Sequence, residues 1–334
     1  SADFGSEQTL CGWLQDTRNL GGIAFLQLRD ITGVIQLTLL KKKLESADFK
    51  KWTTINRESI VLVRGIIKEN KEAPGGVEML PDNLEILNEA EAPLPLGVID
   101  KIDSEIETRL NARYLDLRKK GIAANFQIRA AVSGAVHKHL RRENFLEVQT
   151  PKIIASATEG GTSLFEMKYF DKTAYLAQSP QLYKQMLMSG GLERVYEIGP
   201  AFRAEEHNTP RHLNEFTSID IEMSFADDDV VMGVMERLVD SAARAVAKET
   251  EALETLGMAP IELELPLPRI TYDEAIEMSN GKVEWGEDLS MEATREIAKQ
   301  MNGFYFITKW PLSLKPFYIQ PDEDPKYSRG FDFM

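Results

Sequence analysis

The sequence predicts an α+β protein in which a small β-barrel precedes an antiparallel-sheet domain flanked by helices. Three observations carry this prediction. Short alternating strands fill the first ninety residues, a proline-bearing acidic segment covers residues 88–97, and a helix-spaced apolar stripe then leads to a two-stranded hairpin. A length of 334 residues also suits two domains.

Composition and charge exclude several classes of protein. Hydrophobic residues make up 43% and charged residues 28%, which is typical of a globular protein with a core. With 39 basic and 53 acidic residues the net charge is −14, which argues against a protein that coats DNA but leaves room for a local nucleic-acid site. The single cysteine, Cys11, excludes an intrachain disulfide and suits a reducing compartment. No apolar run has the length of a membrane span and no signal peptide is visible, so we expect a cytoplasmic protein without a membrane partner.

Five stretches of the first ninety residues are typical of strands. They are TLCGWLQDT, IAFLQLRD, VIQLTLL, SIVLVRGIIK and VEMLPDNLEIL, with a helix at residues 45–54 between the third and the fourth. This order predicts a five-stranded Greek-key barrel of the OB type, a fold that often binds oligonucleotides by stacking bases on aromatic side chains. Phe25 lies on the second strand, where a phenylalanine is more often a core residue. The strands alone therefore leave its role open.

The segment NEAEAPLPLG marks a domain boundary, because its two prolines exclude a helix or a central strand. We expect a barrel at residues 1–88, a linker at 89–120 and a second domain at 121–334. Residues 122–143 have the spacing of an amphipathic helix, with an apolar stripe of Phe126, Ala130, Val132, Val136 and Leu140. FLEVQTPKII then begins a predicted strand, with Pro151 where the chain would leave the sheet or contact another surface. Residues 227–257 predict one long amphipathic helix. Neither this segment nor residues 266–303 has a pattern that indicates catalysis or ligand binding.

The hairpin at residues 195–225 carries the most unusual pattern. In its second strand one face holds Phe216, Ser218, Asp220, Glu222 and Ser224, while the other face is mostly apolar. A solvated hairpin would explain the charges but not acids two residues apart on such a strand. We therefore interpret it as a site built on a sheet.

Three more clusters belong beside this hairpin. A Gly-Gly loop, SATEGGTSLF, carries Glu159 and is flexible enough to close over a ligand. Gln181 and Lys184 share a face at the start of a helix, where a lysine either holds a carboxylate or, more often, is simply solvated. Arg203 and Arg211 suit a polyphosphate, and neither a P-loop nor GxGxxG occurs. The sequence therefore favours a nucleotide site built from arginines on a sheet.

These residues resemble a known family. FRAEEHNTPRHLNEF followed by SIDIEM resembles motif 2 of the class II aminoacyl-tRNA synthetases. Together with ATEGG, QSPQLYK and the barrel, the chain resembles the aspartate, asparagine and lysine subgroup, and within it the archaeal-type aspartyl-tRNA synthetases, from GGIAFLQLRD to FDFM. The resemblance implies that the second domain is a class II synthetase catalytic domain.

The resemblance also implies an activity and its residues. The reaction is ATP-dependent activation of L-aspartate to aspartyl-adenylate with Mg²⁺, followed by transfer to the 3′ end of tRNA(Asp). Arg203 would be catalytic at the α-phosphate, and ATP would be bound by Arg203, Glu205, Arg211, His212, Leu213 and Phe216, with Phe216 stacking on adenine. Aspartate would be bound by Glu159, Gln181, Lys184, Arg203 and Asp220. The barrel would contact the anticodon through Phe25, Gln36 and Glu78. The helix before Pro151 resembles motif 1, which implies a homodimer.

One part of the family pattern is missing from these 334 residues. No glycine after Arg203 lies in a motif 3, and the acidic Mg²⁺ ligands that precede that motif are also absent. We expect those ligands beyond Met334, with none in this chain. A polypeptide of these 334 residues is then expected to be inactive, and pyrophosphate exchange at a wild-type rate would contradict this.

Several alternatives stay open. An asparaginyl-tRNA synthetase shares the barrel and motif 2 but needs no lysine for a neutral amide, so Lys184 beside SID favours aspartate. A synthetase-like protein that binds tRNA without catalysis is motivated by the missing motif 3. A paralogue that amidates aspartate would generally lack the barrel. Pro74 and Gln15 resemble the relaxed enzymes that also charge tRNA(Asn), which predicts tRNA(Asn) as a second substrate.

Overall fold

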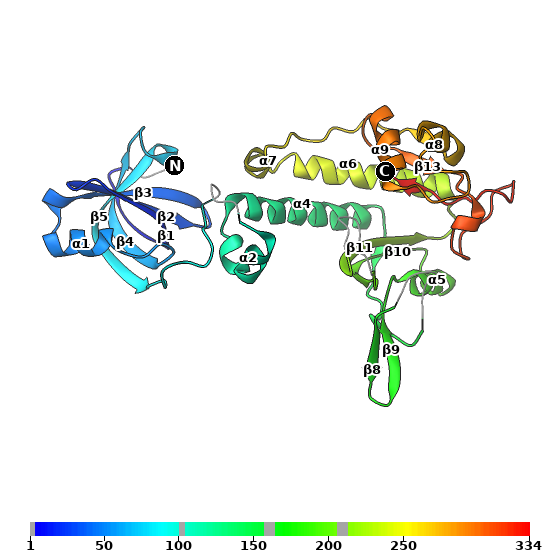
Figure 1. The fold of residues 1–334 in the computed structure, drawn as a ribbon, viewed down its shortest axis with the longest axis horizontal. Coiled ribbons are helices and arrows are strands. Elements are labelled where there is room, and N and C mark those ends of the chain that lie inside the picture. Colours follow the sequence, from blue (N-terminus) through cyan, green and yellow to red (C-terminus); the bar gives the residue numbers. More distant parts are fainter. Residues whose placement is uncertain (1–3, 100–103, 157–163, 206–212) are drawn as a thin grey trace. The chain divides into compact units, whose positions relative to one another are not determined.

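The computed structural model describes residues 4–99, 104–156, 164–205 and 213–334. It divides into two compact units, Ser1–Ala123 and Ala124–Met334, and each is described by itself (Figure 1). Among the described residues, no helix is both long and apolar enough to cross a membrane.

A closed five-stranded barrel forms most of the first unit. Its strands are β1 (Glu7–Asn19), β2 (Ile23–Asp30), β3 (Gly33–Leu40), β4 (Ile60–Glu69) and β5 (Val77–Asn88), in the order β1-β2-β3-β5-β4. Helix α1 (Ser46–Thr53) lies between β3 and β4, and the turn before β5 is a short 3₁₀ segment, Pro74–Gly76. β3 and β5 are parallel and the other pairs antiparallel. This is the strand order expected of an OB-type barrel, so that prediction is confirmed.

Alternation along the strands sets the core of the barrel. On β2 the side chains of Ala24, Leu26 and Leu28 are buried, whereas Phe25 and Gln27 between them are half-buried on the other face. At Gly65 the backbone of β5 comes so close that an added Cβ would lie 2.3 Å from the carbonyl oxygen of Leu80. A glycine is therefore required where β4 and β5 change register.

The segment after the barrel is held by buried charges. It contains α2 (Ile106–Asn111) and α3 (Arg113–Asp116), and the carboxyl group of Asp116 has no solvent exposure. Burial would raise the pKa of Asp116, but its hydrogen bond to Arg109 and the charges of Arg109 and Arg113 outweigh burial and lower the pKa below its ordinary value. Arg118 donates to the buried Glu58 at 2.6 Å, and Arg29 of the barrel donates to the same carboxylate at 2.7 Å. The barrel and this segment thus share one carboxylate.

The second unit begins within a long helix, and its described residues form three small sheets. α4 (Lys120–Arg142) and α6 (Asp228–Val246) pack on the sheet β11-β10-β6 through Val136, Leu140, Phe145, Tyr196 and Val234. The strands of this sheet are β10 (Arg194–Phe202), β11 (Glu215–Met223) and β6 (Leu146–Glu147). β7 (Ile153–Ile154) pairs with the hairpin of β8 (Glu166–Tyr169) and β9 (Lys172–Leu176), which projects from the body of the unit (Figure 1). Helix α5 (Gln181–Ser189) follows this hairpin.

The C-terminal part of the chain has a hydrophobic core of its own. β12 (Arg269–Thr271), β13 (Phe306–Thr308) and β14 (Asp332–Phe333) form a sheet, and the core packed beside it includes Tyr272, Ile297 and Trp310. Helices α8 (Tyr272–Met278) and α9 (Met291–Gln300) pack beside each other over it. The expected α+β class, with a barrel followed by sheets and helices, is confirmed.

The strand predicted at the start of FLEVQTPKII leaves its sheet before Pro151, as expected: β6 ends at Glu147, and β7 after the proline belongs to a different sheet. One expectation about a single element was wrong. Residues 227–257 form two helices, α6 and α7 (Thr250–Leu256), rather than one. The apolar stripe of α4 is buried only toward its C-terminal half, since Phe126 is 48% exposed and Ala130 is exposed, whereas Val136 and Leu140 are buried.

Candidate functional site

The β10–β11 pair sets the geometry of the predicted site. The strands are antiparallel, and Glu197 lies opposite Asp220 while Gly199 lies opposite Ser218. Ile221 and Met223 pack into the core on the helix side, so Ser218, Asp220 and Glu222 face the opposite side. The two faces expected from the alternation are therefore present in the sheet.

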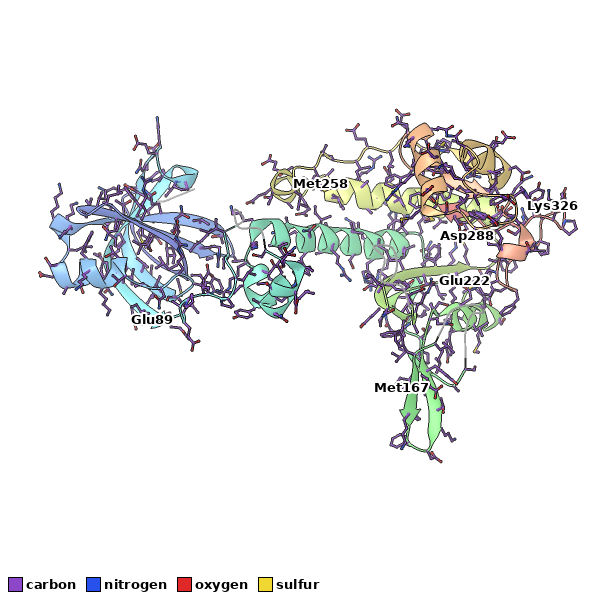
Figure 2. All side chains as sticks on the ribbon, in the orientation of Figure 1. Glu89, Met167, Glu222, Met258, Asp288 and Lys326 are labelled. Atoms are coloured by element: carbon purple, nitrogen blue, oxygen red, sulfur yellow. The ribbon has the colours of Figure 1, made fainter. Side chains whose placement is uncertain are left out.

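Lys184 of α5 contacts this polar face. Its Nζ lies 3.3 Å from Oδ1 of Asp220 and 3.5 Å from Oε2 of Glu222, and it donates to the backbone oxygen of Ile221 at 3.3 Å. The Lys184 side chain is only 13% exposed, so it is not the solvated lysine of a typical helix surface. Ser218 donates to the other oxygen of Asp220 at 2.5 Å. Figure 2 shows Glu222 on β11, beside α5.

Gln181 begins the same helix as Lys184. Its backbone nitrogen donates to the side chain of Ser179 at 3.2 Å, which supports the first turn. Gln181 and Lys184 are three residues apart in α5, so they share a face as the sequence predicted. The structure thus brings Lys184 and Asp220 into contact and places Gln181 one turn earlier.

Arg203 and Phe216 face each other at the end of the hairpin where β10 leads into the connection to β11. The guanidinium carbon of Arg203 lies 5.3 Å from the ring centroid of Phe216, within cation–π range. The backbone of Glu205 is held by Arg203 and by the Asn214 side chain, at 2.8 and 3.0 Å. Leu213 is 63% exposed. Glu159, Arg211 and His212 lie outside the described residues.

The predicted anticodon residues lie together on the barrel. Phe25, Gln36 and Glu78 line one groove on the outer face of β2, β3 and β5. Three donors converge on Oε2 of Glu78: the Thr38 hydroxyl at 2.6 Å, the Asn70 amide at 3.0 Å and the Gln36 amide at 3.4 Å. Phe25 is not in the core, so the core interpretation of this residue is wrong.

Sequence reasoning assigned no role to four residues that the structure places in these sites. Glu222 and Ser218 contact the Lys184–Asp220 pair, and Thr38 and Asn70 hold Glu78. The alternation of β11 contained the signal for the first two. Asn70 contacts Glu78 only because a turn folds back, and no spacing in the sequence indicates this.

Comparison with known proteins identifies the family. A family model described as tRNA synthetases class II (D, K and N) matches residues 105–334, and one described as an OB-fold nucleic acid binding domain matches residues 8–87. The chain belongs to the class II tRNA synthetases. It is 52% identical over 337 residues to the aspartate–tRNA(Asp/Asn) ligase of Archaeoglobus fulgidus, covering 99% of this chain and 78% of that protein.

Two further relatives widen the comparison. The aspartate–tRNA(Asp) ligase of Thermoplasma acidophilum is 48% identical, with 99% of this chain and 78% of that protein covered. Among solved structures, the asparaginyl-tRNA synthetase of Pyrococcus horikoshii, complexed with asparaginyl-adenylate, is similar with a TM-score of 0.90 at 32% identity. That match covers 99% of this chain and 77% of that one.

Membership of this family fixes the general chemistry. A class II tRNA synthetase is a ligase that uses ATP as a substrate to join an amino acid to tRNA, and its OB-fold domain binds nucleic acid. Among the residues that the structure describes, no three His, Cys, Asp or Glu side chains gather in a group that could hold a metal ion. Asp332 on β14 pairs with Lys315 at 3.2 Å.

Proposed function

We propose that this class II synthetase activates L-aspartate with ATP and transfers it to the 3′ end of tRNA(Asp). The observation that carries the proposal is Lys184, a mostly buried ammonium held against Asp220 and Glu222 on the polar face of the sheet. A cation in that position suits a substrate with an anionic side chain. The names of the relatives from A. fulgidus and T. acidophilum support the same substrate.

In this proposal the hairpin residues have separate tasks. The α-carboxylate of aspartate attacks the α-phosphorus of ATP and pyrophosphate leaves. Arg203 stabilises the negative charge that develops on the α-phosphate oxygens, and Phe216, which faces it, offers its ring to adenine. Lys184 and Gln181 bind the aspartate side, and Asp220 orients Lys184. Glu159, Glu205, Arg211, His212 and Leu213 are proposed to complete the two sites. Mg²⁺ is proposed as the companion of ATP.

A direct test compares two amino acids. Protein from the complete coding sequence is assayed for ATP–pyrophosphate exchange with aspartate and with asparagine. We expect exchange with aspartate alone, because the neutral amide of asparagine offers Lys184 no negative charge from the substrate. Exchange that depends on asparagine would instead favour an asparaginyl-tRNA synthetase. Binding of tRNA without exchange would favour the non-catalytic alternative.

The barrel groove is proposed as the anticodon site. Phe25 supplies an aromatic face, Gln36 and Glu78 supply hydrogen-bonding groups, and Lys43 and Lys68 line the same groove. Pro74 and Gln15 favour the proposal that tRNA(Asn) is charged as well. Charging of both tRNA transcripts by the complete protein measures this, and no aspartate on tRNA(Asn) would contradict it.

The assembly is proposed to be a homodimer that buries the exposed part of α4. Phe126 and, on β11, Ile219 are 48% and 45% exposed, and a groove between α4 and the sheet is lined by Arg129, Val132 and Ile219. Apolar side chains gathered in this way are typical of an interface. Sedimentation velocity should give a dimer, whereas Ile219→Lys should give monomers. A cytoplasmic location stays a prediction.

A further inference from the structure

We propose that Glu197 is a positioning residue for the aspartate pocket: it holds Lys152 away from Asp220, so that Lys184 remains the cation of that pocket. The inference rests on the proposed function of Lys184. Glu197 itself is 3% exposed and lies on β10, so it acts through its neighbours rather than on a substrate.

Every described contact of the Glu197 carboxylate goes to the loop that carries Pro151. The backbone nitrogen of Thr150 donates to Oε1 at 3.0 Å and the Thr150 hydroxyl donates to Oε2 at 2.7 Å. The Nζ of Lys152 lies 2.9 Å from Oε1 and also donates to the Thr150 hydroxyl at 3.1 Å. Both carboxylate oxygens are therefore bound, as a buried charge requires.

Glu197 and Asp220 are neighbours on the same face of the sheet. They lie directly opposite each other in the β10–β11 register, a position in which two like charges repel. A small enclosed space is lined by Thr150, Lys184, Glu197 and Asp220. Next to it, Gly199 leaves room for the carboxylate, because an added Cβ there would lie 3.2 Å from Oε1 of Glu197.

Each of these two acids forms an ion pair with a different lysine. Lys152 pairs with Glu197, and Lys184 pairs with Asp220 and Glu222. If Glu197 lost its charge, the Lys152 ammonium would have no carboxylate at 2.9 Å, while Asp220 lies opposite Glu197 in the strand register. Lys152 would then compete with Lys184 for Asp220. Glu197 prevents this competition by binding Lys152 through a charge-assisted hydrogen bond.

The main experiment is a rescue. In aspartate-dependent exchange by the complete protein, Glu197→Gln should raise the KM for aspartate about tenfold and leave the KM for ATP within about twofold, as expected for loss of one charged contact. The double variant Glu197→Gln/Lys152→Met removes the competing cation and should return the KM for aspartate to within about threefold of wild type. A double variant no better than the single one would overturn the proposal, and so would an unchanged KM in Glu197→Gln.

Two further variants separate positioning from a loss of stability. Glu143→Gln removes a similar ion pair, to Arg237 at 2.7 Å, elsewhere in the unit, and should leave both KM values unchanged. Gly199→Ala keeps the charge of Glu197 but displaces it, and should raise the KM for aspartate less than Glu197→Gln does. If Glu143→Gln raised the KM for aspartate as much as Glu197→Gln does, the role of Glu197 would be structural only and the proposal would be overturned.

A measurement without substrate keeps this inference distinct from the proposed function. Lysines are reductively methylated with ¹³C, and the Lys184 signal is assigned with Lys184→Arg. We expect that signal to move in Glu197→Gln and to return in the double variant. If aspartate supports no exchange in the wild type, the proposed function fails, while this signal still decides whether Glu197 controls Lys184. If the Lys184 signal did not move in Glu197→Gln, the inference would be overturned.

Discussion

The barrel groove and the polar face of the β10–β11 sheet hold their acidic side chains by different means. In the barrel groove, Glu78 is bound by the neutral donors Thr38, Asn70 and Gln36, and within the described part of the chain it forms no ion pair. On the β10–β11 sheet, Glu197 and Asp220 are each paired with a lysine. Neutral donors leave a carboxylate with its negative charge, whereas a lysine cancels it.

This difference matches what each surface is proposed to bind. Nucleobase edges present N–H donors, and a carboxylate that keeps its charge is a strong acceptor for them. Aspartate and ATP are anions, which acids without cations would repel. The same side-chain type therefore serves opposite purposes, and the partner of each carboxylate decides which. Four substitutions test the comparison, from the largest expected effect on aminoacylation to the smallest.

Lys184→Met should have the largest effect. It leaves Asp220 and Glu222 facing an anionic substrate, so we expect kcat/KM for aspartate to fall about 100-fold or more, or about 3 kcal/mol, in pyrophosphate exchange. Lys168→Met, on the exposed hairpin, is the matched control and should have no effect. An effect below threefold at Lys184 would remove the basis for the aspartate pocket.

Phe25→Ala tests the barrel. Loss of stacking on one base costs about 1 to 3 kcal/mol, so kcat/KM for tRNA should fall about 5- to 150-fold. Exchange without tRNA should not change. Ile31→Ala, at a fully exposed turn position of the same barrel, serves as the control. A loss of exchange in Phe25→Ala would mean that the two surfaces are not separate.

Thr38→Val asks whether neutral donors matter for Glu78. The substitution keeps the shape of the side chain and removes the 2.6 Å hydrogen bond. We expect the KM for tRNA to rise about threefold to tenfold, because one hydrogen bond to a charged group is lost. Charging assays over a range of tRNA concentrations measure this. An unchanged KM would show that Glu78 holds its position without Thr38.

Asp116→Asn should have the smallest effect on activity, below about twofold at neutral pH, because no substrate is proposed at this cation-bound acid. Its effect lies in stability. The pKa of Asp116 is lowered from 3.8, so the unfolded state binds more protons below that pH, and the stabilisation is lost as pH falls through the folded pKa. Urea unfolding from pH 6 to pH 3 should show a shallower pH dependence in Asp116→Asn than in the wild type. Parallel curves would contradict this.

Patterns of period two explain why much of the fold was predictable. The alternation of IAFLQLRD fixed which residues of β2 are buried, and the alternation of SIDIEM placed Asp220 and Glu222 on one face. Lys184 was predictable as a residue of a helix, but its contact with Asp220 depends on where α5 lies against the sheet. No local pattern contains that position.

Other features depend on tertiary packing and were missed for that reason. FLEVQTPKII has the composition of one strand, yet its two halves pair with different partners, β10 and β9. Phe126 and Val136 belong to the same apolar stripe of the predicted helix. Only Val136 is buried, because the sheet and α6 pack against that part of the helix. No local sequence pattern predicts the contacts of Glu197, because its partners Thr150 and Lys152 lie 47 and 45 residues away in the chain.

The carboxylate shared by Arg29 and Arg118 has a practical consequence for dissecting the protein. A barrel cut after Asn88 keeps Glu58 and Arg29 but loses Arg118, together with the small core of Leu96, Val98, Ala112 and Leu115. A piece that ends after Ala123 keeps both arginines on Glu58 and the cations on Asp116. An excised barrel module should therefore extend to residue 123, well past its last strand.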